Sequence, residues 1–185
     1  MYKRQELVVG QTKEVQFSFD TKHGTDDYLE VIGGKTASLI RTSAKLGAMA
    51  SNSSPGLIES ISSWAWHSGI IFQITDDILD LNSDTETLGK PAGNDILEGT
   101  YTLPVLLALE KDRIKIEDIL HQVKNSEIEL VEVLREFNND EIVEESNKFV
   151  NHHFKQSNDA IKNIEDKKIS NILNNINEYL LQRSN

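Results

Sequence analysis

One short segment, Phe72 to Asp80, combines three carboxylates and an amide with large apolar residues. At about 100° per helical residue, Gln73, Asp76, Asp77 and Asp80 fall within an arc of about 100° on a helix. Removing several carboxylates from water is costly unless positive charge lies opposite them. Oxygen ligands on one face suit Mg²⁺ that keeps some waters and shares phosphate oxygens. The segment therefore predicts a divalent-cation site for a phosphate-bearing ligand.

Two other interpretations of this segment are weaker. A solvated helix face would also carry aspartates, but the flanking residues, such as Ile70 and Ile74, are apolar. An EF-hand loop starting at Asp80 would need glycine at its sixth position and glutamate at its twelfth. Thr85 and Pro91 occupy those positions, so a calcium loop of this kind is excluded.

Two lysines could complete a phosphate site. Lys90 lies between Gly89 and Pro91 in a predicted loop, and Lys35 lies next to Thr36 on a predicted helix. An ammonium group binds phosphate as a point charge. Each lysine alone is typical of a protein surface, but together with the aspartates they predict a phosphate clamp. The five histidines lack acidic partners at ligand spacing, so we expect them to be structural or solvated.

The composition narrows the classes of partner. A formal net charge of −11 argues against nucleic acid as the main partner and against a basic membrane-binding face. There are no cysteines, which excludes disulfides, thiolate metal sites and cysteine nucleophiles. No apolar run is long enough for a transmembrane segment, and the first residues do not form a signal peptide. We therefore expect a cytoplasmic setting.

The elements that must position these residues are predicted to be helices. Thr25 suits a helix cap, and Pro55 suits the first position of a helix. A polar loop is expected over 82–100, and no strand alternation or internal repeat is present. The chain therefore predicts an all-α fold, as one domain or a portion of one. Helices are expected over 28–50, 57–81, 102–109, 116–124, 127–137, 141–165 and 168–182.

Four motifs resemble the trans-isoprenyl diphosphate synthases, also called polyprenyl synthetases, in their order and spacing. They are Lys35-Thr36, Phe72-Gln73-x-x-Asp76-Asp77-x-x-Asp80, Gly89-Lys90-Pro-Ala-Gly-Asn-Asp95 and Thr102-Leu-Pro104. The resemblance implies a helical bundle of the isoprenoid synthase type. It also implies head-to-tail condensation of an allylic prenyl diphosphate with isopentenyl diphosphate, assisted by Mg²⁺.

The resemblance also implies a role for each motif residue. Asp76, Asp77 and Asp80 would form the second aspartate-rich motif and bind Mg²⁺ directly or through water. Lys35 and Lys90 would hold the leaving diphosphate. Thr36 and Gln73 would face the cationic carbon, Phe72 would line the isopentenyl pocket, and Asp95 would orient Lys90 or a bound water.

Parts of the family pattern are absent. The first aspartate-rich motif, the arginines that follow it and the upstream basic isopentenyl site are all missing, and Asp26-Asp27 at a helix start is no substitute. We therefore expect residues 1–185 to be the C-terminal portion of one synthase domain, incomplete at the N-terminus, with 1–9 unassigned. Such a chain is expected to be inactive alone and a homodimer when full length.

Two alternatives remain open at this point. The chain could be a non-catalytic or regulatory subunit of a hetero-oligomeric prenyl diphosphate synthase. It could also be an acidic helical interaction module in which the aspartates have no function. The length of the prenyl product cannot be predicted, because residues near the absent motif govern it in the family.

Overall fold

Residues 3–82, 92–162 and 164–182 are described by a computed structural model, and the structural statements below concern these residues. They contain helices and turns but no strand, which confirms the all-α prediction. The elements are α1 (Lys3–Gln16), α2 (Thr25–Ile32), η1 (Gly33–Ala37), α3 (Ser38–Ala50), α4 (Pro55–Asn82), α6 (Asn94–Leu97), α7 (Leu103–Lys111), α8 (Arg113–Lys124), α9 (Leu130–Phe137), α10 (Asp140–Lys162) and α11 (Lys167–Gln182).

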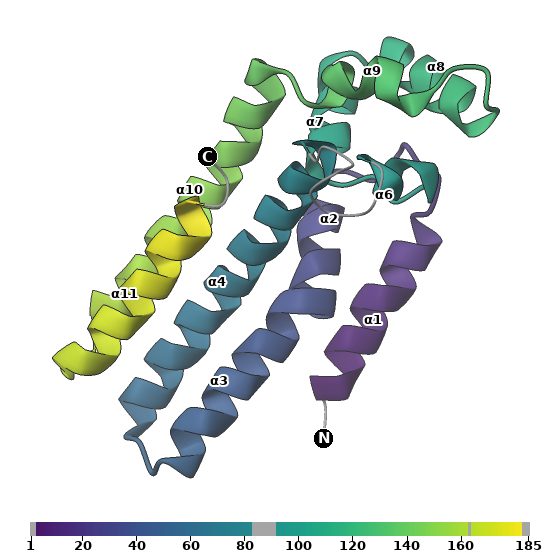
Figure 1. Cartoon of the computed structure of the whole chain (residues 1–185). Coiled ribbons are helices and arrows are strands. Elements are labelled where there is room, and N and C mark those ends of the chain that lie inside the picture. The colour runs from purple at the N-terminus through teal and green to yellow at the C-terminus, as the bar shows by residue number, and fades with distance from the viewer. Residues whose placement is uncertain (1–2, 83–91, 163, 183–185) are drawn as a thin grey trace.

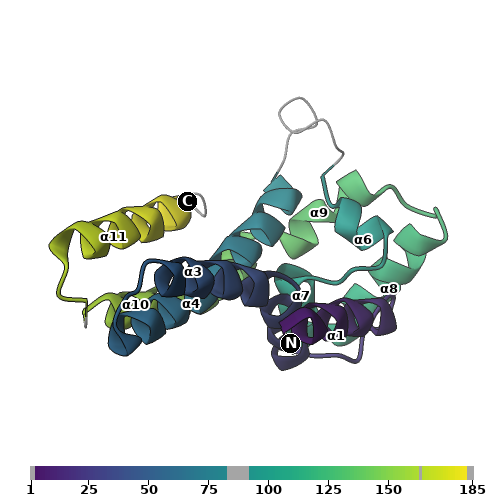
Figure 2. The ribbon, with the colours of Figure 1, turned by 90° about the horizontal axis from the view of Figure 1, so that it is seen from below.

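The long helix α4 is the centre of the bundle. It packs mainly against α3 on one side and α10 on the other, and α11 folds back beside α10 (Figure 1). Turned by 90°, the molecule shows α11 toward one end and α6, α8 and α9 toward the other (Figure 2). No described helix is long and apolar enough to cross a membrane.

Two apolar clusters hold the helices together. The larger lies where α4, α7 and α10 meet and includes the fully buried Ile74, Leu103 and Val150. The smaller joins α4, α10 and α11 around Trp64 and Leu173. Burying one such side chain stabilises the fold by about 1.5–3 kcal/mol. Because α4 contributes to both clusters, the packing of this helix fixes the position of its aspartates.

The segment predicted as one helix over 28–50 is interrupted by a π-helical turn, η1, between α2 and α3. This turn carries Lys35 and Thr36. The predicted cap is wrong by one residue, because Gly24 is the N-cap and Thr25 is the first helical residue. The Gly24 N–H donates to Asp27 Oδ2 at 3.0 Å, so a carboxylate in the first turn binds the N-cap backbone, and the expected hydroxyl cap is not formed.

Two further corrections concern the ends of the bundle. Helix α1 was not predicted, because its apolar residues Leu7, Val8 and Val15 form no buried stripe and remain exposed. The expected loop over 82–100 contains the short helix α6 in its described part. The other helices agree with prediction within a few residues at each end, the range in which boundaries are uncertain from sequence.

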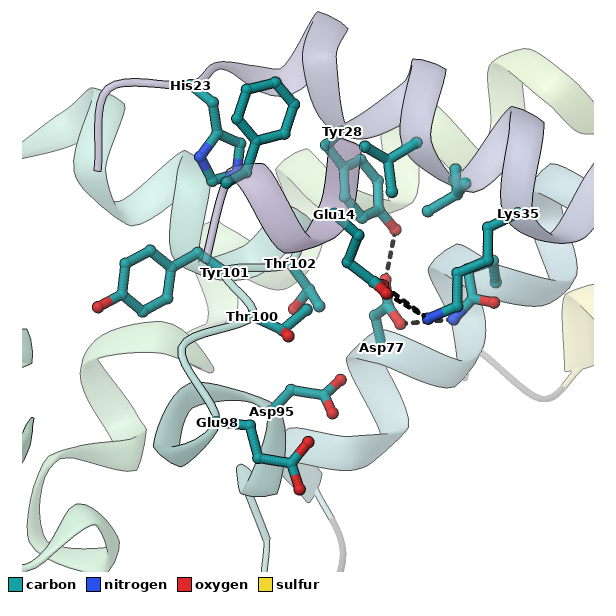
Figure 3. A pocket seen from close by; sticks show the side chains of 14 residues that line it. Glu14, His23, Tyr28, Lys35, Asp77, Asp95, Glu98, Thr100, Tyr101 and Thr102 are labelled. Atoms are coloured by element: carbon teal, nitrogen blue, oxygen red, sulfur yellow. Dashed lines mark hydrogen bonds and ion pairs between the residues drawn. The ribbon is translucent and has the colours of Figure 1, made fainter. Parts of the chain in front are cut away.

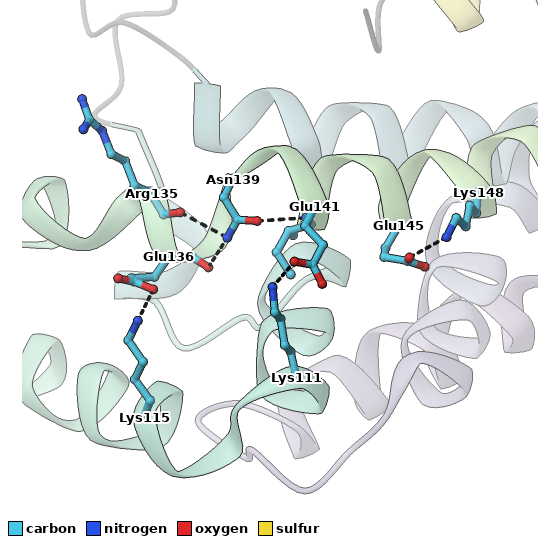
Figure 4. Close-up of polar contacts among 9 residues, drawn as sticks. Lys111, Lys115, Arg135, Glu136, Asn139, Glu141, Glu145 and Lys148 are labelled. Atoms are coloured by element: carbon cyan, nitrogen blue, oxygen red, sulfur yellow. Dashed lines mark hydrogen bonds and ion pairs between the residues drawn. The ribbon is translucent and has the colours of Figure 1, made fainter.

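The junction between α9 and α10 is closed by polar contacts (Figure 4). Asn139 Oδ1 accepts from a backbone N–H in the first turn of α10 at 3.1 Å. Lys115 Nζ lies 2.6 Å from Glu136 Oε2, and Lys111 pairs with Glu141. Exposed ion pairs contribute at most about 1 kcal/mol each. These contacts therefore link α8 to α9 and α7 to α10, and they orient the helices more than they stabilise the bundle.

Candidate functional site

A cavity of about 170 Å³ opens between α1, α2, α4 and the segment that joins α6 to α7 (Figure 3). Acidic, aromatic and hydroxyl side chains surround a single lysine among its described walls. The lining residues are Glu14, Phe17, His23, Tyr28, Val31, Ile32, Lys35, Gln73, Asp77, Asp95, Glu98, Thr100, Tyr101 and Thr102.

The three aspartates of the α4 motif lie in different environments. Asp76 is exposed, Asp80 is half-buried, and Asp77 is only 4% exposed. The Tyr28 hydroxyl donates to Asp77 Oδ2 at 2.5 Å, and Gln73 Nε2 donates to Asp77 Oδ1 at 2.8 Å. The helical period predicts one shared face, but the tertiary packing encloses Asp77 and leaves Asp76 at the surface.

The described walls of the cavity carry more carboxylates than cationic side chains. Burial raises the pKa of Asp77 to about 7, although the bonds from Tyr28 and Gln73 act in the opposite direction. Burial, with the neighbouring charges of Asp80 and Glu98, raises the pKa of Asp95 to about 6. Burial also raises the pKa of Tyr28. A bound cation would favour the ionised carboxylates, since opposite charge within a few ångströms lowers a carboxyl pKa.

Thr36 and Gln73 are joined directly. Thr36 Oγ1 donates to Gln73 Oε1 at 2.7 Å, which links η1 to α4. One turn before Gln73, the backbone of α4 runs against η1 at Gly69, where a Cβ would lie only 2.7 Å from Ala37 Cα. This close approach positions the hydroxyl and the amide within hydrogen-bonding distance.

Lys35 is paired with a residue of α1. Its Nζ donates to Glu14 Oε1 at 2.6 Å and Oε2 at 2.8 Å, inside the cavity (Figure 3). Gly10, one turn before Glu14, allows the two backbones to meet, because a Cβ there would lie 2.5 Å from Lys35 N. Lys35 thus faces the predicted diphosphate site but is neutralised by a carboxylate of the same chain.

The structure brings together only part of the predicted site. Lys35, Gln73, Asp77 and Asp95 line the cavity, and Thr36 adjoins it through Gln73. The other predicted residues on α4 are not among the described walls: Phe72, which is 36% exposed, together with Asp76 and Asp80. Lys90 lies outside the described residues.

Several lining residues were missed by the sequence interpretation, among them Glu14, Tyr28 and Glu98. Tyr28 could have been found by its spacing, since it precedes Lys35 by seven residues and so lies on the same side, two helical turns away. Glu14 follows the Gly10-Gln pair, but its proximity to Lys35 depends on how α1 packs. Glu98 follows the short helix α6, which was expected to be loop.

The donor set fits a hard divalent cation that also binds phosphate. The acidic side chains of the cavity provide only oxygen donors, which Mg²⁺ and Ca²⁺ prefer. Within the part of the chain that the structure describes, no group of three or more His, Asp or Glu side chains is arranged to hold an ion. Diphosphate oxygens and waters would add to the ligands that these described side chains provide.

Comparisons with known proteins test the family resemblance. The sequence model of the polyprenyl synthetase family matches residues 3–137. Component 2 of heptaprenyl diphosphate synthase from Bacillus subtilis (strain 168) is 33% identical over 141 residues, which are 76% of this chain and 40% of that protein.

Solved structures have the same fold. Heptaprenyl diphosphate synthase from Staphylococcus aureus superposes with a TM-score of 0.89 at 26% identity, over 99% of this chain and 58% of that one. Geranylgeranyl pyrophosphate synthase from Corynebacterium glutamicum, complexed with calcium and isoprenyl diphosphate, gives 0.82 at 30% identity, over 98% and 57%. This chain spans 40–58% of the length of these relatives. It belongs to the polyprenyl synthetase family and has the all-α fold of the isoprenoid synthases.

Proposed function

We propose that this chain forms one wall of the metal–diphosphate site of a trans-prenyltransferase, which condenses an allylic diphosphate with isopentenyl diphosphate. The observation that carries this proposal is the cavity that places Lys35, Asp77 and the Thr36–Gln73 pair together. Family membership supports the class of reaction, and the relative from Corynebacterium glutamicum that was solved with isoprenyl diphosphate supports a prenyl diphosphate as ligand.

The chemistry requires the separation of an organic cation from a diphosphate. Such a step is accelerated by charges and dipoles that are already in position, and it needs no protein nucleophile. Mg²⁺ held by Asp76, Asp77 and Asp80, directly or through water, would neutralise the leaving diphosphate. Lys35 would exchange its bond to Glu14 for the diphosphate, and Lys90 would add a second ammonium group. Asp95 would support these groups from the edge of the cavity.

The side-chain carbonyl oxygen of Gln73 would face the carbocation that forms when the diphosphate leaves. Because Gln73 Nε2 is bound to Asp77, its Oε1 is directed to Thr36. Two oxygen dipoles at this position would stabilise a developing carbocation. Phe72, one residue earlier on α4, would contact the apolar part of isopentenyl diphosphate.

We further propose that the isolated chain does not catalyse prenyl transfer, because its sequence carries one aspartate-rich motif where the family uses two. A second candidate is a non-catalytic or regulatory subunit of a hetero-oligomeric synthase. The word "component" in the name of the Bacillus subtilis relative favours that candidate. The motif residues that the chain retains favour the first candidate, the wall of a metal–diphosphate site.

Binding and activity can be tested separately. Calorimetry with Mg²⁺ and inorganic pyrophosphate should detect binding that Asp76→Asn and Asp80→Asn each weaken at least about tenfold. Asp118→Asn, on the exposed face of α8, is the matched control. Unchanged binding in both motif variants would favour the acidic interaction module instead.

Turnover distinguishes the two candidates. Mg²⁺-dependent prenyl transfer by the purified chain alone would contradict the proposed inactivity. Activity that appears only after mixing with a full-length synthase, together with co-purification, would favour the subunit role.

A further inference from the structure

We infer that Tyr28 is a positioning residue of the proposed diphosphate site: by anchoring Asp77 it fixes the amide of Gln73, so that direct metal contact falls to Asp76 and Asp80. This inference rests on the proposed function and divides the roles within the α4 motif, which the sequence treats as equivalent. Tyr28 belongs to α2, an element that carries none of the family's motifs.

The first step in the argument is the burial of the pair. Tyr28 and Asp77 are each 4% exposed. The hydroxyl and the carboxylate meet at 2.5 Å, within the range of short charge-assisted bonds. Tyr28 comes from another helix, so this contact joins α2 to α4.

The second step is that both carboxylate oxygens of Asp77 are engaged. Oδ2 accepts from Tyr28 and Oδ1 accepts from Gln73. A cation bound directly by Asp77 would have to enter an enclosed position and compete with both donors. Asp76 and Asp80 are less enclosed than Asp77, because the first is exposed and the second half-buried.

The third step concerns the orientation of Gln73. A carboxylate is only an acceptor, so it selects the NH₂ end of the neighbouring amide. The oxygen end then receives the hydroxyl of Thr36. Four side chains from α2, η1 and α4 thus form one connected set of bonds that converges on Asp77. Tyr28 and Gln73 both donate to this carboxylate, and Thr36 donates to Gln73.

The simplest alternative is that the ring of Tyr28 only fills the core. Tyr28→Phe tests this directly, because it keeps the ring and removes the hydroxyl. Tyr101→Phe is the matched control, since Tyr101 is 6% exposed and lines the same cavity, and its hydroxyl makes no bond to Asp77.

Two measurements on the full chain decide between these roles. The side-chain amide signals of Gln73 in a ¹⁵N–¹H NMR spectrum should shift in Tyr28→Phe and stay in place in Tyr101→Phe. Binding of Mg²⁺ with inorganic pyrophosphate should weaken about three- to tenfold in Tyr28→Phe. Adding Asp77→Asn to Tyr28→Phe should weaken this binding little further, because the two residues act as one unit. Adding Asp76→Asn to Tyr28→Phe should weaken it by as much as Asp76→Asn does alone.

The inference is overturned if the Gln73 signals do not move in Tyr28→Phe, or if the effects of Tyr28→Phe and Asp77→Asn on binding simply add. It is also overturned if Asp77→Asn alone abolishes binding as strongly as Asp76→Asn. Failure of the wild-type chain to bind Mg²⁺ and pyrophosphate would instead contradict the proposed function, and the Gln73 signals would still report on the role of Tyr28.

Discussion

Gly69 of α4 and Ala37 of η1 are in backbone contact: a methyl group built on Gly69 would lie 2.7 Å from Ala37 Cα. The same contact positions Thr36 against Gln73. Gly69→Ala should therefore push η1 away from α4, lower the free energy of unfolding by about 1–3 kcal/mol and weaken pyrophosphate binding. Chemical denaturation and calorimetry measure these two effects.

Gly47 provides the control for this prediction. It lies inside α3, and no atom is within 4 Å of a Cβ built there. Gly47→Ala should stabilise the chain by about 0.5–1 kcal/mol through helix propensity. Equal effects of the two substitutions would contradict the close-contact explanation.

Asn177 attaches α11 to the bundle. Its Oδ1 accepts from Trp64 Nε1 at 2.9 Å and from the hydroxyls of Ser68 and Ser157 at 3.0 Å each. Asn177→Ala should cost about 2–4 kcal/mol, because three buried donors lose their acceptor. Denaturation measured by circular dichroism checks this. The exposed Asn174 on the same helix is the control, and a similar loss in Asn174→Ala would argue against the buried network.

His153 makes stability depend on pH. Burial, followed by the charges of His67 and His152, lowers the pKa of His153 from 6.5 to about 4. Between pH 6.5 and 4 the unfolded chain therefore binds more protons than the folded chain. The contribution of neutral His153 to the free energy of unfolding is complete above pH 6.5 and is lost as pH falls toward 4. Solvent screening limits the loss to about 1 kcal/mol.

The measurement is the difference in unfolding free energy between His153→Gln and wild type across this pH range. A difference is needed because the raised pKa of Asp77 acts in the opposite sense: its contribution to stability grows as pH falls from about 7. His121→Asn, at an exposed position of α8, is the control. A pH-independent difference for His153→Gln would show that the histidine contact does not titrate.

Glu14 competes with phosphate for Lys35. Glu14→Gln removes the carboxylate that holds Nζ at 2.6 and 2.8 Å and one negative charge from the cavity. Affinity for inorganic pyrophosphate without metal should therefore rise about three- to tenfold, as measured by calorimetry. Glu30→Gln breaks the exposed Lys13–Glu30 pair outside the cavity and should have little effect. Weaker metal-free binding in Glu14→Gln would contradict this competition.

A helix could be predicted from the sequence where its residues carry a clear local signal, and not where its position depends on packing. Helix α4 was predicted nearly to its observed ends, because an apolar helix bounded by Pro55 and a polar loop has a clear local signal. Helix α1 has no such signal, since Gly10 is its one buried residue among 5–16 and its apolar side chains face outward. Its function here is to bring Glu14 to Lys35, which depends on packing alone.

The sequence by itself determined the residue types that line one face of α4, the Lys35-Thr36 pair and the family, because these depend on spacing along single helices. Only the tertiary structure decided that Asp77 is enclosed by Tyr28 while the adjacent Asp76 is exposed. The physical reason is that neighbouring residues on a helix point about 100° apart, so the helix packed against them decides which one is buried.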